Sequence, residues 1–268
     1  MEYYKKNTSF SIEYHTGGNV SNSEHFHDLY EFYYLKEGKA AYLVNDKIFN
    51  ISKGDVVVIP PNTLHKTISF KNIKRERILF YLEKRFLTFI PNAHMFLPDK
   101  PVFCHTSKIQ RLENIFEEIL NEFNDNNNQN YIEVLICELL ILLQRTNDNN
   151  FIAYESEELP GIVSGVLKYI ASNYNKDISL NDISKHYNVN FSYLSRTFKK
   201  YTGFTYCNYL NQYRVKEANK LLSSTNKKIV EIALECGFNS SNNFCKCYKK
   251  IMGFSPVTYR KFMSNNIV

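Results

Sequence analysis

Three histidines and a glutamate near the start of the chain have the types and spacing of a polar binding site. His25, His27 and Glu31 are two and four residues apart, so in an extended segment their side chains point to one face, and His65 could approach from a neighbouring strand. Together they could hold iron, manganese, zinc or nickel. They could instead form hydrogen bonds to an organic effector. We favour the second interpretation and predict no bound metal or other cofactor, because ligand types alone do not fix occupancy.

Aromatic residues follow this cluster closely. Tyr33 and Tyr42, with Tyr30, Phe32 and Tyr34, would place ring faces and hydroxyl groups near the mouth of a barrel. Such a surface suits a small molecule with an apolar body and a few polar groups, for example a sugar. They could equally be ordinary strand residues, because aromatic residues are favoured in any strand.

A pattern that occurs twice in the last hundred residues carries a second group of functional residues. The copies span 192–203 and 242–253. Leu194 and Phe198 are four residues apart in the first copy, as are Phe244 and Tyr248 in the second, so each pair lies on one helical face. A shorter helix with apolar spacing precedes each copy. The repeat predicts two helix-turn-helix units, and the second has a turn one residue longer.

Capping residues indicate where these helices end. Gly203 and Gly253 fall where a helix C-terminus favours a left-handed residue, and Thr205 and Ser255 can cap the helices that follow. A connecting helix is expected from about Tyr206 to Leu222. Its predicted buried stripe is Leu210, Tyr213, Ala218 and Leu221.

The side chains that this packing leaves outward are donor-rich, which suits base edges and phosphates. From residue 161 onward there are 16 Lys or Arg against 5 Asp or Glu, whereas residues 1–160 hold 17 against 22. A basic half with two groove-reading helices predicts double-stranded DNA as the partner. The predicted DNA-binding residues are Ser192, Tyr193, Ser195, Arg196, Lys199 and Lys200 in the first unit, and Asn242, Asn243, Lys246, Lys249 and Lys250 in the second.

The segment from about Gly161 to Met263 resembles the DNA-binding domain of the AraC/XylS family of bacterial transcription regulators. The tail pattern of that family is met from Gly237-Phe238 through Gly253, Pro256, Tyr259 and Arg260. The departures are Cys247 at a usually aliphatic position and Tyr206 where the second copy has Pro256. The resemblance implies a homodimer that acts with RNA polymerase, and a connecting helix that holds the two recognition helices at a fixed separation.

The first hundred residues instead show short runs typical of strands, at 30–35, 40–44, 47–51, 56–59 and 77–81, with turns at 45–46 and 53–55. Many short strands without intervening helices predict an antiparallel barrel or sandwich. The run from His25 to Glu31 followed by Gly38, and the run from Gly54 to His65, resemble the two cupin motifs. Asn62 stands where a cupin enzyme commonly has glycine.

Two amphipathic helices are expected between these regions, one with Ile109 to Phe123 on its apolar face and one with Ile132 to Leu143, separated by an Asn-rich turn. They are a candidate dimer interface, although they could simply pack on the barrel. The polar stretch up to Gly161 lacks apolar periodicity, so we expect few contacts across it. The expected fold is α+β: a cupin-like antiparallel β-barrel with two helices at 1–150, a linker at 151–161, and an all-α domain of two helix-turn-helix units at 162–264.

Composition limits the remaining functional classes. No apolar run is long enough to span a membrane, and no signal peptide is evident, so we expect a cytoplasmic protein whose six cysteines are reduced. The leading hypothesis is a sequence-specific transcription regulator, not an enzyme, with an effector site formed by His25, His27, Glu31, Tyr33, Tyr42 and His65. The alternative is a metal-dependent cupin enzyme with a DNA-binding tail, in which His25, His27, Glu31 and His65 are the ligands.

Overall fold

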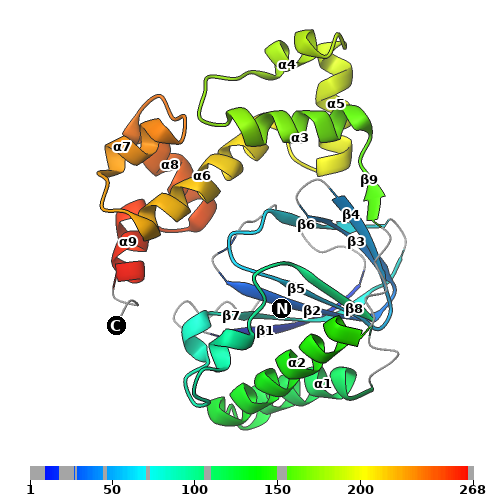
Figure 1. Ribbon diagram of the computed structural model, residues 1–268. Helices are drawn as coiled ribbons and strands as arrows, with labels where there is room; N and C mark the ends of the chain where they lie inside the picture. The colour runs from blue at the N-terminus through cyan, green and yellow to red at the C-terminus, as the bar shows by residue number, and fades with distance from the viewer. Residues whose placement is uncertain are drawn as a thin grey trace.

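The computed structural model describes residues 10–17, 27, 29–44, 47–70, 73–105, 110–149 and 156–264. It has an N-terminal β domain with two helices beneath it and a C-terminal helical domain above it (Figure 1). The α+β architecture predicted from the sequence is confirmed. Asn45, Asp46 and Ile109 lie outside the described residues.

Two antiparallel sheets form the N-terminal domain, and together they are the expected cupin-like barrel. One sheet has the order β1-β7-β2-β5-β8 and the other β6-β3-β4-β9. The five predicted strands are present, whereas β1, β6, β8 and β9 were not predicted. The strands are β1 (Phe10–Thr16), β2 (Tyr30–Glu37), β3 (Lys39–Val44), β4 (Lys47–Ser52), β5 (Asp55–Ile59), β6 (His65–Ser69), β7 (Glu76–Leu82), β8 (Val102–His105) and β9 (Ser156–Glu158).

Side chains alternate between the two faces of each sheet, and this alternation produces separate cores. Tyr33 and Leu35 of β2 point between the sheets, where they meet Tyr42 of β3. The intervening Phe32 and Tyr34 point the other way, toward α1 (Gln110–Asp125) and α2 (Gln129–Asn149). Two 3-10 turns, η1 (Lys84–Phe86) and η2 (Ala93–Phe96), lead from β7 toward β8.

The apolar stripes predicted for α1 and α2 belong to the core of their own domain. Leu112, Phe116 and Ile119 of α1 and Ile136 and Leu139 of α2 are fully buried against the β1-β7-β2-β5-β8 sheet. These side chains therefore cannot form the dimer interface proposed for them. Packing on the barrel, the other reading of the pattern, is what the structure shows, because one face of this sheet would otherwise be exposed.

Each predicted helix-turn-helix unit is present in the helical domain. After α3 (Gly161–Asn173), the first unit is α4 (Leu180–His186) and α5 (Phe191–Thr202); the connecting helix α6 (Tyr206–Ser224) leads to α7 (Ile229–Glu235), α8 (Ser241–Met252) and α9 (Pro256–Ser264). The turn of the second unit is one residue longer, as predicted. Gly203 and Gly253 are left-handed, with φ of 77° and 79°. Thr205 and Ser255 accept the expected capping hydrogen bonds.

The connecting helix has a somewhat different buried face from the one expected. Leu210 and Ala218 are buried as predicted, whereas Tyr213 and Leu221 are only half-buried. Val215 and Leu222 are the other apolar residues that α6 buries in its C-terminal half. The stripe shifts because α6 packs on both units in turn, so no single line of residues faces a single partner.

The prediction of few contacts across the linker is wrong. Ser156–Glu158 forms β9 and pairs with β4, and Leu159 is buried beside α3. Leu43 and Leu64 of the β domain join the same cluster. A three-residue edge strand carries too little periodicity to be recognised in a polar sequence, yet its backbone pairing and one leucine bring α3 close to the β6-β3-β4-β9 sheet (Figure 1).

Candidate functional site

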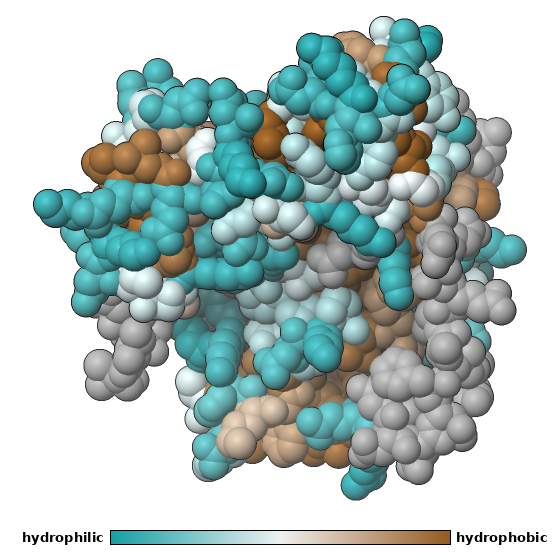
Figure 2. All heavy atoms as spheres, turned by 45° about the horizontal axis from the view of Figure 1, so that its top comes forward, coloured by the Kyte–Doolittle hydropathy of each residue, from teal (hydrophilic) through white to brown (hydrophobic). Residues whose placement is uncertain are grey.

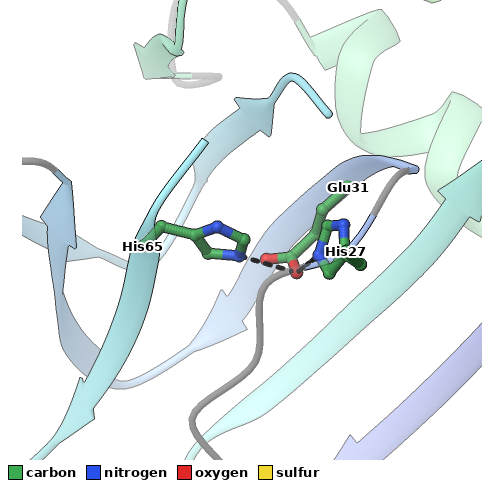
Figure 3. Close-up of side chains that lie close together, drawn as sticks. All are labelled: His27, Glu31 and His65. Carbon is green, nitrogen blue, oxygen red and sulfur yellow. Dashed lines mark hydrogen bonds and ion pairs between the residues drawn. The ribbon is translucent and has the colours of Figure 1, made fainter. Parts of the chain in front are cut away.

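Three of the four predicted polar residues converge between the two sheets (Figure 3). The Nε2 atoms of His27 and His65 lie 3.2 and 3.3 Å from Oε2 of Glu31. The other carboxylate oxygen, Oε1, accepts a hydrogen bond of 2.8 Å from the Tyr42 hydroxyl. Glu31 and His65 are buried, so this carboxylate has exchanged water for two imidazoles and a phenol. His25 lies outside the described residues.

The cluster is assembled from distant parts of the chain. His27 precedes β2, Glu31 is the second residue of β2, and His65 begins β6. Because β6 belongs to the opposite sheet, His65 approaches Glu31 from across the barrel and not from a neighbouring strand as expected. Asn62 just before β6 has φ of 61°, a left-handed conformation that asparagine tolerates, which explains why it can replace the glycine usual in cupins.

The charges of the cluster stabilise one another. Burial would raise the pKa of Glu31, but the charge of His65 and the hydrogen bonds of both histidines hold that pKa well below its usual range. Burial would lower the pKa of His65, but Glu31 raises it above its ordinary value. Burial and the charge of Glu31 both raise the pKa of Tyr42, which keeps its hydroxyl protonated and able to donate.

Only part of the predicted aromatic surface reaches this site. Tyr33 and Tyr42 lie between the sheets, with ring centroids 5.3 Å apart. Tyr30, Phe32 and Tyr34 pack instead in the core on the other face of the sheet, so their predicted place near a barrel mouth is wrong. The alternation of β2 separates the two sets, which a count of aromatic residues does not reveal.

Two buried arginines were not predicted from the sequence. Arg75 and Arg77 are only 2 and 4% exposed, and burial lowers the pKa of Arg75. Arg77 alternates with Leu79 and Tyr81 on the inner face of β7. The signal was available, because counting in steps of two along the predicted strand 77–81 assigns Arg77 to the same face as Leu79.

The two recognition helices present their predicted residues to solvent. The buried apolar and aromatic residues are Leu194 with Phe198 in α5 and Phe244 with Tyr248 in α8, as predicted. Figure 2 shows hydrophilic residues over much of the helical domain, which comes forward in that view. Ser195 is half-buried, and the other predicted DNA-binding residues are exposed: Ser192, Tyr193, Arg196, Lys199, Lys200, Asn242, Asn243, Lys246, Lys249 and Lys250.

Local hydrogen bonds fix the start of each recognition helix. The side chain of Asn190 caps α5 by accepting from the backbone of Ser192 and Tyr193, and Ser240 caps α8 by accepting from Asn243. Such caps determine which residues stand in the first turn, where a recognition helix contacts base edges.

Two protein families match the chain. The AraC-like ligand binding domain matches residues 9–140, and a helix-turn-helix domain matches residues 183–261. The chain belongs to the AraC family of transcription regulators. In this AraC-family chain the first match contains the His27–Glu31–His65 cluster, and the second contains α5 and α8. The chain is thus a DNA-binding transcription regulator whose N-terminal domain binds a small-molecule effector.

Relatives of similar length agree with this assignment. The transcriptional activator RhaR of Mannheimia succiniciproducens is 26% identical, over 88% of this chain and 86% of its own length. The melibiose operon regulatory protein of Escherichia coli K12 is 24% identical, over 97% of this chain and 90% of its own.

Among solved structures, the C-terminal domain of the response regulator AraT of Geobacillus stearothermophilus is 34% identical, covering 40% of this chain and 88% of that one with a TM-score of 0.39. Within the described residues, no helix of this AraC-family regulator is long and apolar enough to cross a membrane.

Proposed function

We propose that the His27–Glu31–His65 cluster, with Tyr33 and Tyr42, binds the polar groups of the effector, and that the exposed faces of α5 and α8 contact the operator. One observation supports the effector site above all: between the two sheets, a buried carboxylate lies at hydrogen-bond distance from two imidazoles and a phenol. Buried polar groups are costly, so the presence of such a cluster in a ligand-binding domain supports a binding role for it.

The donors and acceptors of this site suit a carbohydrate. Glu31 accepts hydrogen bonds, Tyr42 donates one, and the ring faces of Tyr33 and Tyr42 offer apolar surface nearby. A sugar presents hydroxyl groups around an apolar face and matches both. The E. coli relative is named for the melibiose operon, and this supports a sugar as the effector of the present chain.

The exposed cations and amides of the recognition helices have distinct roles in this proposal. Arg196 of α5 and Lys246 of α8 occupy equivalent positions, exposed on each helix, and would contact base edges in successive major grooves. Lys199, Lys200, Lys249 and Lys250 lie in the last turn of each helix and would contact phosphates.

We further propose that the protein acts as a homodimer with RNA polymerase, in the cytoplasm, where its DNA target lies. Because the inner faces of α1 and α2 are buried, we place the dimer contact on the outer face of α2 instead. There Tyr131, Val134 and Ile141 are exposed at helical spacing. The chain is proposed not to be an enzyme, as its relatives are regulators.

The test is to identify the DNA that the full-length protein retains from fragments of its own genome. We expect a small set of fragments sharing two half-sites, with the set or the affinity changed when an effector sugar is present. The double variant Arg196→Ala, Lys246→Ala should retain fragments without sequence preference. Equal enrichment by the wild type and this variant would refute the assignment of α5 and α8 as readers.

A metal ion in the same cluster is the second candidate, and the histidine orientations favour it. Nδ1 of His27 lies 2.9 Å from the Leu29 carbonyl oxygen and Nδ1 of His65 lies 2.8 Å from that of Thr63, so both Nδ1 atoms carry protons and donate. Each Nε2 atom then faces Oε2 of Glu31, and a proton or a metal cation must lie between the nitrogen and the oxygen. A carbonyl behind each imidazole is the usual support of a metal-binding histidine, and two histidines with one carboxylate suit iron, zinc or nickel.

Metal content and folding stability separate the two candidates. If the cluster binds only an organic effector, as we propose, protein purified without added metal should contain far less than one equivalent, and a chelator should leave the unfolding midpoint unchanged. Stoichiometric metal, with a lower midpoint after its removal and no such change in Glu31→Gln, would establish the metal site instead.

A further inference from the structure

The two buried arginines lie at the other end of the same barrel interior. In the pairing of β7 with β2, Arg77 of β7 lies opposite Leu35, and Tyr81 of β7 lies opposite Glu31. Four residues along β7 correspond to about 13 Å, so the arginine end and the Glu31 end are separated by roughly the length of a small effector. Arg75 immediately precedes β7, and it adds a second buried positive charge at this end.

No carboxylate of the described residues neutralises Arg77. Within that part of the chain it forms no ion pair, and its buried Nη1 has no hydrogen-bond acceptor. The acidic side chains on nearby strands are already engaged: Glu13 of β1 pairs with His15, Glu37 of β2 pairs with Lys53, and Asp55 of β5, the strand beyond β2, accepts from the backbone of Ser52 and pairs with His105. The charge of Glu31 is balanced locally by its two histidines, and its other oxygen accepts from Tyr42.

Two tyrosines link the ends of the interior. The buried Tyr33 hydroxyl lies beside the guanidinium groups of Arg75 and Arg77, yet it meets no hydrogen-bond partner at good geometry among the described residues. Its ring contacts that of Tyr42, whose hydroxyl donates to Glu31. A polar row thus runs from the Glu31 cluster through Tyr42 and Tyr33 to Arg77.

We propose that Arg77, supported by Arg75 and Tyr33, binds an anionic group of the effector. The effector class is then a carbohydrate that carries a carboxylate or a phosphate, with the anion at Arg77 and hydroxyl groups toward Tyr42 and Glu31. This inference rests on the proposed effector site and deepens it.

The physical reason is the cost of an unanswered buried cation. A guanidinium taken out of water loses hydration that only a close anion or several hydrogen bonds restore, and its planar donors match carboxylate and phosphate oxygens in pairs. A neutral sugar would need no such group, because tyrosines and the Glu31 cluster already provide donors and acceptors. A binding residue of this kind stabilises the complex at the expense of the free protein.

Thermal unfolding of the full chain tests the anion site with inorganic phosphate and acetate as probes, against chloride at equal ionic strength. For the wild type we expect a saturable rise in midpoint of about 2 to 4 °C. Arg77→Met, which keeps the length of the side chain but removes its charge, should lose that rise. The basic helical domain also attracts phosphate, but its contribution is the same in both proteins. Arg77→Lys should keep part of the response.

The unliganded variants provide the second measurement. If Arg77 serves to bind a ligand, then without added anion Arg77→Met should have the same midpoint of thermal unfolding as the wild type or a higher one. A lower midpoint for Arg77→Met, together with identical anion responses in the two proteins, would show that Arg77 is structural and overturn the proposal.

Matched sugars distinguish the source of the anion and separate this inference from the proposed function. Glucose, glucuronate and glucose 6-phosphate, with the corresponding galactose set, would be compared for their effect on the midpoint. We expect one charged form to exceed its neutral parent at least tenfold in affinity, and Arg77→Met to abolish that preference. If neutral sugars bind as well as charged ones and Glu31→Gln weakens them all, the Glu31 effector site stands and the anion site falls.

Discussion

The two helix-turn-helix units are nearly equal in local structure but differ in what they rest on. Each recognition helix has a polar N-cap, two buried apolar residues one turn apart and a left-handed glycine at its end. The second unit packs its own cluster around Phe244 and Tyr248, which contains no residue of the β domain. The first unit shares its cluster with Leu43 and Leu64 of the β domain. The sequence repeat alone shows only the similarity.

Further contacts with the β domain follow the same division. The Lys66 ammonium lies 5.2 Å from the centroid of the Phe204 ring. It also occupies the space that a Cβ atom would need at Gly203, directly after α5. On the second unit's side, Asn219 of α6 donates to Asn62 at 3.0 Å, and Arg85 lies 5.7 Å from the Phe262 ring centroid. Apolar packing holds the first unit, whereas single polar and ring contacts reach the second.

Strand β6 links this difference between the units to the proposed effector site. His65 points into the barrel toward Glu31, and Lys66 points out toward the first unit, because successive residues of a strand face opposite sides. A displacement of His65 by a ligand would move Lys66 as well. We therefore expect the effector to act on the first unit more than on the second.

The largest expected effect comes from removing the apolar support. Leu64→Ala leaves a cavity beneath the first unit and should cost about 2 to 4 kcal/mol of local stability. Hydrogen exchange should accelerate in α5 and remain unchanged in α8. Leu222→Ala, at a buried position in the second cluster, is the mirror control and should accelerate exchange in α8. Equal acceleration of both helices by Leu64→Ala would mean that the units unfold as one.

The next prediction tests whether the two units contribute equally to specific DNA binding, although only the first packs on the β domain through apolar residues. Arg196→Ala and Lys246→Ala should each weaken specific binding by on the order of 1 to 3 kcal/mol, and each should relax the preference in a different part of the site. Lys199→Ala and Lys249→Ala should weaken specific and non-specific binding about equally. Quantitative footprinting on a retained genomic fragment measures both, and a footprint unaltered by the Arg196, Lys246 double variant would contradict the symmetry.

These regions also show what sequence can predict. The buried pairs of α5 and α8, the glycines that end them and the caps Thr205 and Ser255 of the helices that follow depend on residues within a few positions of one another, so these features of both units were predicted correctly. The pairing of β9 with β4 and the burial of Leu43 under α3 depend on segments about a hundred residues apart. No local period encodes such contacts.

The same contrast holds within the candidate site. The types and spacing of His27, Glu31 and His65 were enough to predict that they meet, and the structure brings them together. That His65 crosses from the facing sheet depends on sheet order, which the motif does not contain. Arg77 was not predicted as a buried residue, although its alternation with Leu79 and Tyr81 in the predicted strand 77–81 assigns it to the interior.

A smaller effect is expected at Lys66. Lys66→Met removes the cation above Phe204 and should accelerate hydrogen exchange at the end of α5 by about two- to fivefold, the change that corresponds to 0.5 to 1 kcal/mol for an ion over an aromatic ring. Lys39→Met, at an exposed position on β3, removes the same charge from the same sheet and should have no effect. If both variants behave alike, net charge and not the contact with the first unit is responsible.

The smallest effect is a pH dependence that starts in the Glu31 cluster. The pKa of His65 is raised in the folded protein, so its contribution to stability is complete below its unfolded pKa of about 6.5 and is lost as pH rises through the higher folded value. The pKa of Glu31 is lowered, so its contribution is complete above about 4.5 and is lost only as pH falls through the lower folded value. The two contributions are therefore complete together between about pH 4.5 and 6.5.

Unfolding by urea at pH 6 and pH 9, with a chelator present, measures this contribution. The loss of stability between the two pH values should be larger in the wild type than in Glu31→Gln, which keeps the shape of the side chain but cannot hold the His65 charge. The same rise in pH should accelerate exchange in α5 more than in α8, since Lys66 follows His65 directly. An equal pH response in the wild type and Glu31→Gln would show that other groups set it, and an equal response in both helices would show that the cluster does not distinguish the two units.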